Sequence, residues 1–246
     1  MLPVRDNIPT NQVPYVTYAL IAANIIVYFF WQRGGLSLGD PSNLHYQCQL
    51  AEWGAVPRDI THNAQPPLPA DCGTDEASPY LTIFSAMFMH GGLLHLGGNM
   101  LFLWIFGNNV EDAMGPLKYL LFYVLSGVAA LALQIVPDPN STVVTLGASG
   151  AIAGVLGGYI RLFPRAKVIT VIFIIFFFTI LELPAMLVLG FWFVEQALFA
   201  ANSIGSTGGG VAYFAHVGGF LFGFLTVRFF ADPKRVDRQR ERVAYS

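Results

Sequence analysis

Residues 147–161 read GASGAIAGVLGGYIR, and this stretch decides the fold class that the sequence predicts. It is largely apolar, and Gly150, Gly154 and Gly158 recur at every fourth position, which places them on one face of a helix. Small residues at this spacing let two helices pack closely inside a membrane. We therefore predict a helix buried within a bundle of membrane-spanning helices.

The composition of the whole chain agrees with a membrane protein. Of its 246 residues, 54% are hydrophobic and only 11% are charged, whereas a soluble domain carries about 25% charged residues. A membrane-spanning helix uses about 20 apolar residues, so the apolar fraction suffices for about six spans. This balance excludes a soluble globule and a disordered chain. The net charge of −2 offers no basic surface, which argues against nucleic acid as a partner.

The apolar runs predict an all-α polytopic membrane protein, built as one membrane domain over residues 1–246. A long polar loop separates the first two spans, and residues 232–246 are expected to form a charged, mobile cytoplasmic tail. The six spans are expected at about residues 15–31, 91–109, 117–136, 148–163, 183–201 and 211–230.

Basic residues set the expected orientation, because Lys and Arg accumulate on the cytoplasmic side of short loops. With six spans and a cytoplasmic N-terminus, only Arg33 and Arg58 of the 13 basic residues fall outside. The run from Val168 to Leu181 is also strongly apolar, but a seventh span there would move the basic C-terminal cluster outside. We therefore expect this run to be re-entrant or interfacial. Both termini are expected on the cytoplasmic side of a plasma (inner) membrane.

The external loop between the first two spans contains both cysteines of the chain, Cys48 and Cys72. A disulfide between them requires an oxidising compartment, which the expected orientation provides. Two unpaired thiols are equally compatible with the sequence, so the pairing stays open at this point.

Four polar side chains lie at similar depth in three of the expected spans. His95 and Asn99 are four residues apart, so they share one face of the second span, about 6–12 Å below its outer end at about 1.5 Å per residue. Ser149 lies in the first turn of the fourth span, and His216 lies near the outer end of the sixth. All four therefore fall in the outer half of the membrane and can face one cavity.

Glycines beside these residues allow the fourth and sixth spans to approach each other. Gly147 and Gly150 flank Ser149, while Gly219 and Gly223 follow His216 on nearly the same helix face. If the two helices pack through these glycines, Ser149 comes within hydrogen-bond reach of the imidazole.

A serine hydroxyl becomes a useful nucleophile when a base accepts its proton, and histidine is the usual base. Ser149 and His216 can form this pair. The Ser149 backbone amide and the side chains of His95 and Asn99 can donate hydrogen bonds to the oxyanion. The only central carboxylates, Glu182 and Glu195, lie beside or on the fifth span, and no Asp lies in the spans that carry these residues. We therefore expect a Ser-His dyad, with no cofactor and no metal.

Three segments of the chain resemble the signatures of rhomboid intramembrane serine proteases. They are HGGLLHLGGNMLFLWIFGNNVED from residue 90, GASGAIAGVLGGYIR from residue 147 and AHVGGFLFG from residue 215. The resemblance covers about residues 79–231. It implies a six-span core that cuts transmembrane segments of other proteins near their outer end through an acyl-enzyme.

The resemblance also implies roles for individual residues. Ser149 corresponds to the nucleophile and His216 to the base, with His95, Asn99 and the Ser149 amide around the oxyanion. His90 and Glu111 correspond to structural residues. The chain departs from the family where Tyr80 and Leu81 occupy the region of a frequent Trp-Arg pair. It also has Ala153 where some members place a tyrosine that stacks on the catalytic imidazole.

Other interpretations of the same residues are available. Ser149 alone can be a helix cap, and His95, Asn99 and His216 can be hydrogen-bonding residues between helices. Together these interpretations describe a non-catalytic membrane binder or transporter with a polar midmembrane pocket. Glu195 can reach the interface by snorkelling or take part in substrate gating. The expected partners are transmembrane substrates and the lipid bilayer, while the oligomeric state is left open.

Overall fold

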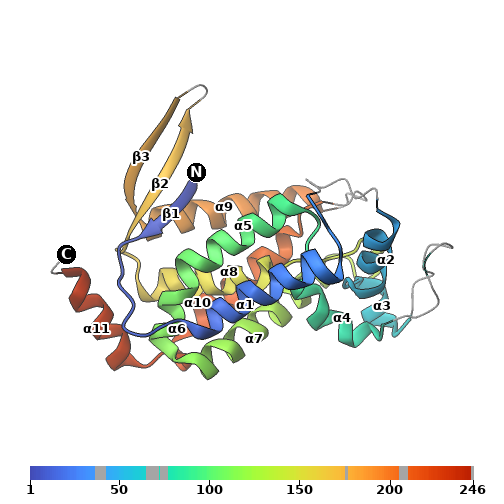
Figure 1. Cartoon of the computed structure of the whole chain (residues 1–246), viewed down its shortest axis with the longest axis horizontal. Helices are drawn as coiled ribbons and strands as arrows, with labels where there is room; N and C mark the ends of the chain where they lie inside the picture. Colours follow the sequence, from blue (N-terminus) through green and yellow to red (C-terminus); the bar gives the residue numbers. More distant parts are fainter. Residues whose placement is uncertain (37–42, 65–71, 73–76, 175–176, 205–209, 245–246) are drawn as a thin grey trace.

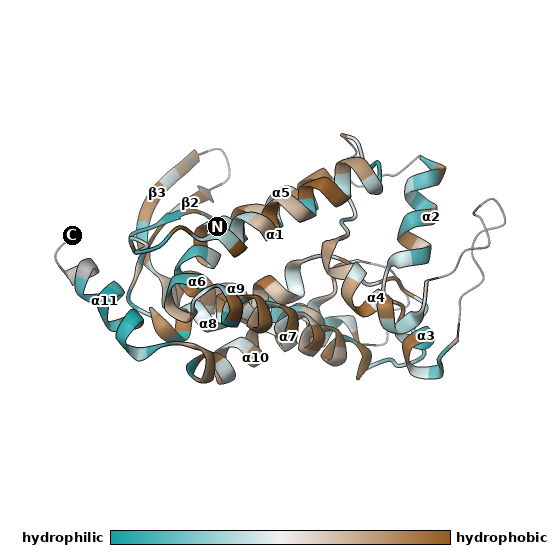
Figure 2. Ribbon diagram, turned by 60° about the horizontal axis from the view of Figure 1, so that its bottom comes forward, coloured by the Kyte–Doolittle hydropathy of each residue, from teal (hydrophilic) through white to brown (hydrophobic). Residues whose placement is uncertain are grey.

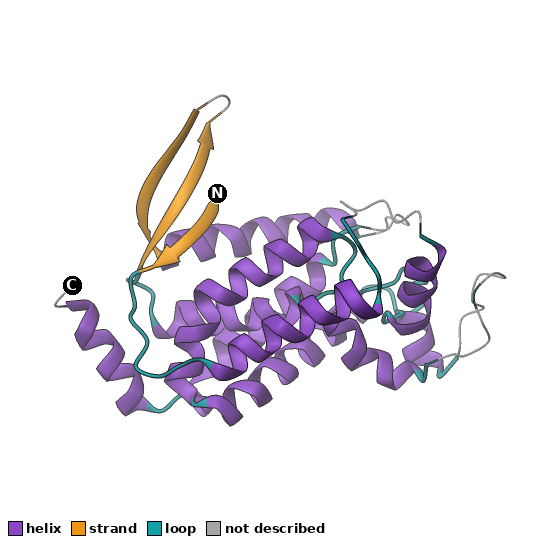
Figure 3. Ribbon diagram, in the orientation of Figure 1, coloured by secondary structure: helices purple, strands orange, loops and turns teal. Residues whose placement is uncertain are grey.

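The computed structural model describes the chain except residues 37–42, 65–71, 73–76, 175–176, 205–209 and 245–246. The protein is mostly helical, with a small sheet at one end (Figure 3). Its α-helices are α1 (Tyr15–Ile26), α2 (Leu44–Trp53), α3 (Pro57–His62), α4 (Pro79–Ser85), α5 (Leu93–Phe102), α6 (Asn108–Met114), α7 (Pro116–Ile135), α8 (Ser149–Leu162), α9 (Ala185–Ser203), α10 (Tyr213–Phe230) and α11 (Pro233–Ala244). Short helical turns of other types are η1 (Val27–Trp31), η2 (Ala86–Phe88) and η3 (Leu103–Gly107).

Helix α8 packs against both α10 and α7, which also pack against each other (Figure 1). Every residue from Gly150 to Ile160 is buried. The small residues make this possible. A Cβ atom added to Gly219 would overlap the carbonyl oxygen of Gly150, and one added to Gly223 would overlap that of Gly154. The backbones of α8 and α10 therefore touch at two successive turns, as small-residue stripes permit in membranes.

Three helices among the described residues are long and apolar enough to cross a membrane by themselves: α7, α9 and α10. The first helix is shorter and continues through a π-helical turn, giving the apolar segment Tyr15–Trp31. Helices α5 and α6 are likewise joined by the π-helical turn η3. Helix α8 has only 14 residues, consistent with a place inside the bundle rather than at its surface.

The apolar run from Val168 to Leu181 corrects the expectation of an all-helical chain. It forms an antiparallel hairpin of β2 (Lys167–Ile174) and β3 (Phe177–Pro184), to which β1 (Leu2–Asp6) adds a third strand in the order β1-β2-β3. The run consists largely of Val, Ile, Phe and Thr, which favour strands. Apolar periodicity cannot separate a short buried helix from such a strand.

The charged C-terminal segment also differs from expectation, because residues 233–244 form a helix that packs back on the bundle. The Gln239 amide donates to the carbonyl oxygen of Asn109 at 3.2 Å, and the Arg240 guanidinium donates to that of Leu162 at 2.7 Å.

The N-terminal segment is held by hydrogen bonds at the same end of the bundle. The Glu111 carboxylate accepts hydrogen bonds from the backbone amides of Val16 and Thr17 and so caps the start of α1.

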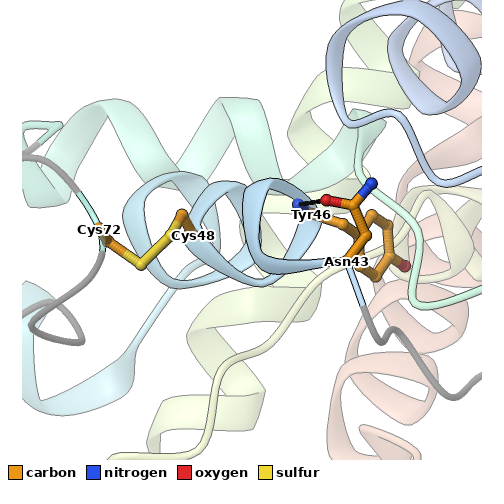
Figure 4. Close-up of a disulfide and its surroundings, with 4 residues drawn as sticks. All are labelled: Asn43, Tyr46, Cys48 and Cys72. Atoms are coloured by element: carbon orange, nitrogen blue, oxygen red, sulfur yellow. Dashed lines mark hydrogen bonds between the residues drawn. A yellow bond between two sulfur atoms is a disulfide. The ribbon is translucent and has the colours of Figure 1, made fainter.

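The loop between the first two expected spans folds into α2 and α3 at the opposite end of the bundle (Figure 1). Cys48 and Cys72 form a disulfide, with their Cα atoms 5.4 Å apart (Figure 4). This loop reaches the segment that precedes α8, since Ala55 pairs with Thr145 in a short β-bridge. The disulfide therefore lies at the same end of the molecule as Ser149.

Candidate active site

Ser149 is the first residue of α8, and its hydroxyl faces His216 of α10. The Oγ atom lies 2.8 Å from Nε2 of the imidazole. Both side chains are placed by the contact between α8 and α10. Gly150 directly follows Ser149, Gly219 lies three residues after His216, and these two glycines touch across the helices. The structure thus brings together two residues that are 67 positions apart in the sequence.

The other nitrogen of the imidazole has a partner from α9. Nδ1 of His216 lies 2.7 Å from Oε1 of Gln196, and both side chains are buried. An amide oxygen can only accept a hydrogen bond, so Nδ1 carries the proton. In the neutral ring Nε2 is then free to accept from the Ser149 hydroxyl. This is the tautomer that a general base requires.

Gln196 was missed by the sequence reasoning, which singled out its charged neighbour Glu195. Adjacent residues on a helix point about 100° apart, given about 3.6 residues per turn, so only one of the two can face the site. Glu195 is partly exposed, whereas Gln196 is buried. The sequence does carry a signal for Gln196, because it is a neutral amide inside an apolar span and polar groups in spans usually face the bundle interior.

Trp192 lies one turn before Gln196, on the same face of α9. Its ring centroid is 5.7 Å from that of His216, with an interplanar angle of 36°. Ala153, which occupies the position of the tyrosine expected in some rhomboids, is fully buried in α8. The imidazole therefore has aromatic neighbours from α9 and from α10, where the Tyr213 ring lies edge-on at 6.5 Å.

His95 and Asn99 face the same site from α5. Nδ1 of His95 accepts a hydrogen bond from the Gly91 amide at 3.3 Å, which leaves the proton on Nε2. A Cβ atom on Gly147 would lie 2.8 Å from His95 Nε2 and 3.6 Å from Ser149 Oγ. The N–H of His95 therefore lies beside the Ser149 hydroxyl. Gly147 also has φ +119°, which disfavours any side chain there.

The Asn99 amide nitrogen is buried and has no hydrogen-bond partner in the described part of the chain. A buried donor without a partner is costly. The residue Asn99 lines a cavity of about 1060 Å³, together with His95, Ser149, Trp192 and His216. This volume is large enough for several residues of an extended peptide.

His90 lies behind this site and is held by the external loop. Its backbone amide donates to Gln32 Oε1 at 3.1 Å, and its carbonyl oxygen accepts from the Tyr46 hydroxyl. Its ring packs edge-on against His95, with centroids 5.1 Å apart. Burial lowers the pKa of His90 to about 3, so the ring is neutral near pH 7. From this position the His90 ring can hold the His95 ring in its orientation.

Within the described residues, no group of three or more His, Cys, Asp or Glu side chains is placed to hold a metal ion. The groups that the structure brings together at this site are a serine hydroxyl, an imidazole and nearby N–H donors.

Comparison with known proteins places these residues in a family context. Residues 77–233 match the model of the Rhomboid domain. The chain is 32% identical over 179 residues to Rhomboid protein 1, mitochondrial, of Saccharomyces cerevisiae, covering 68% of this chain and 46% of that protein. It is 26% identical over 226 residues to Rhomboid protease GluP of Bacillus subtilis, covering 91% of this chain and 36% of that protein. The chain thus spans less than half the length of these two relatives.

Proposed function

The chain belongs to the rhomboid family, and from that premise we propose that it is an intramembrane serine endopeptidase with Ser149 as nucleophile and His216 as general base. The observation that carries the proposal is the 2.8 Å contact between Ser149 Oγ and His216 Nε2, in the tautomer set by Gln196. Relatives named as proteases, such as GluP, support the same activity.

In the first step of the proposed reaction, Ser149 Oγ attacks the carbonyl carbon of the substrate peptide bond while His216 Nε2 takes the hydroxyl proton. The carbonyl oxygen becomes an oxyanion. Its donors are the Ser149 backbone amide at the start of α8, the His95 Nε2–H group and the Asn99 amide. The unpartnered Asn99 nitrogen supports this assignment, since an oxyanion would supply its missing acceptor.

Collapse of this intermediate breaks the C–N bond, and the imidazolium gives its proton to the leaving amine. An acyl-enzyme remains on Ser149. Water then attacks the ester, again with His216 as base, and releases the carboxylate product while the serine hydroxyl is restored. Gln196 is neutral, so it positions the imidazole in both halves of the reaction without neutralising the imidazolium.

The proposed topology has six spans and both termini on the cytoplasmic side of a plasma (inner) membrane. Two observations support it. The Cys48–Cys72 disulfide requires an oxidising compartment and lies at the Ser149 end of the bundle. The basic helix α11 lies at the other end (Figure 1). The cavity would then open to the extracytoplasmic side and receive an unwound stretch of a transmembrane substrate, because a helical peptide bond is shielded from Ser149.

The test uses purified protein and a model transmembrane substrate. Ser149→Ala and His216→Ala should each abolish cleavage, and a fluorophosphonate probe should label Ser149 in the parent but not in His216→Ala. Cleavage by Ser149→Ala near the parent rate would refute the mechanism. A parent that neither cleaves nor reacts with the probe would instead support a non-catalytic binder or transporter.

A further inference from the structure

The β2–β3 hairpin carries an apolar tip that the proposed protease activity does not use. We define the hairpin tip by Phe173, Phe177 and Phe178, whose side chains are 66%, 80% and 69% exposed. Monomeric soluble surfaces rarely expose such a patch. The tip therefore needs an environment other than water.

Both faces of the tip are apolar. Phe173 and Phe178 are paired across the ladder, so they share one face, while Phe177 is adjacent to Phe178 and points to the other face. A protein partner that docks on one face would leave the other in water. Immersion in lipid covers both faces at once.

Charge is concentrated at the opposite end of the hairpin. Lys167 and Glu182 lie at its base and form an ion pair of 3.7 Å, with both side chains largely exposed. Arg165 is exposed just before β2. The base therefore has a net positive charge, which matches anionic lipid headgroups. An apolar tip and a basic base are typical of a segment that dips into a membrane surface.

The position of the hairpin connects it to the lipid-facing surface of the bundle. β3 leads directly into α9 through Pro184, and α9 exposes Met186, Leu187, Phe191, Val194 and Leu198. The hairpin projects from the bundle at the end where both chain termini lie (Figure 1). The hydrophobic colour of the helices continues onto β3 (Figure 2).

The backbone limits how deeply the hairpin can enter. β3 is an edge strand, and β1 pairs with β2 only as far as Val171, so the distal part has two open edges. Open sheet edges do not occur in the hydrocarbon core, because their N–H and C=O groups have no partners there. At the boundary between headgroups and acyl chains, water and headgroups can satisfy these groups.

We propose that the hairpin tip inserts into the headgroup and acyl-chain boundary of the leaflet at the termini end, beside α9. The hairpin is then a second contact with lipid, separate from the spans. This inference does not depend on proteolysis.

The experiment places an environment-sensitive fluorophore on Phe178→Cys and, in a second variant, on Phe173→Cys. Leu198→Cys on α9 is the lipid-facing control, and Asp237→Cys, exposed on α11, is the water-facing control. Each protein is reconstituted in vesicles of equal parts phosphatidylcholine and phosphatidylglycerol. Lipids carrying a spin label near the headgroup or deep in the acyl chain serve as quenchers.

Both tip variants should show blue-shifted emission close to that of the Leu198 variant, with stronger quenching by the shallow label than by the deep one. Emission like that of the Asp237 variant would overturn the proposal. So would blue-shifted emission that no lipid label quenches, because the tip would then be covered by protein, for instance by β3 edges of two copies. Matched thermal unfolding of the labelled proteins confirms that the substitutions leave the fold intact.

Discussion

If the proposed proteolysis is correct, removing the Gln196 side-chain amide should slow it without unfolding the protein. In Gln196→Leu the acceptor 2.7 Å from His216 Nδ1 is lost, while a side chain of similar size still fills the space. The Nδ1–H group then becomes a buried donor without a partner, which costs about 1–3 kcal/mol. Because about 1.36 kcal/mol corresponds to a tenfold change in rate, kcat should fall about 5- to 150-fold.

The assay measures cleavage of a transmembrane substrate in detergent and separates kcat from KM. We expect the loss in kcat and in the rate of fluorophosphonate labelling, with KM nearly unchanged, since Gln196 contacts His216 and is not among the residues that line the cavity. Gln196→Glu offers a carboxylate oxygen at the same reach and should recover much of the rate. Thermal unfolding midpoints for both variants show whether the fold is retained.

The neighbouring residue provides the matched control. Glu195→Gln changes the charge on the adjacent face of α9, and we expect parent-like cleavage, which would also remove a gating role for Glu195. Parent-like kcat in Gln196→Leu would refute the positioning role. Equal losses in Gln196→Leu and Gln196→Glu, with a lowered unfolding midpoint in both, would show that Gln196 acts only in packing.

Two further predictions concern packing and pH. Gly219→Ala should lower the free energy of unfolding by about 1–3 kcal/mol and reduce cleavage, because its Cβ would overlap the Gly150 carbonyl oxygen. Gly190→Ala on α9 is the control and should unfold like the parent, since the added Cβ meets nothing within 4 Å. Equal unfolding midpoints for the two variants would contradict the close contact between α8 and α10. Burial raises the pKa of Asp6 to about 6 from 3.8. The folded protein therefore holds a proton that the unfolded chain releases between these values, so stability falls as pH rises through this window. Asp6→Asn should lose this part of the pH dependence in thermal unfolding, and an unchanged profile would show that Asp6 ionises normally.

The residues that the structure brings together at the candidate site could be selected from the sequence because they carry local signals. Ser149 precedes a glycine stripe, and His95 and Asn99 share a face through their four-residue spacing. Their expected depth along the spans then placed these three residues and His216 in the same outer half of the membrane. Gln196 escaped this reasoning, because its partner His216 is 20 residues away and the rotation of α9 about its axis is set by packing.

The β2–β3 hairpin shows a second limit. A run of Val, Ile and Phe is compatible with a buried helix or with a strand. Strand pairing between Lys167 and Pro184, and between β1 and β2, depends on residues far from the run itself. The disulfide is a similar case, because Cys48 and Cys72 can pair only after the loop has brought their Cα atoms to 5.4 Å.

The sequence by itself determined the membrane class, the helix that carries Ser149 and the polar residues available for chemistry, because composition and helical periodicity are local properties. Tertiary structure alone decided which nitrogen of His216 faces Ser149, which α9 side chain contacts the imidazole, and that the apolar run beyond α8 forms strands. These features depend on how helices rotate and strands align once packed, and the free energy that selects them comes from contacts between segments distant in the chain.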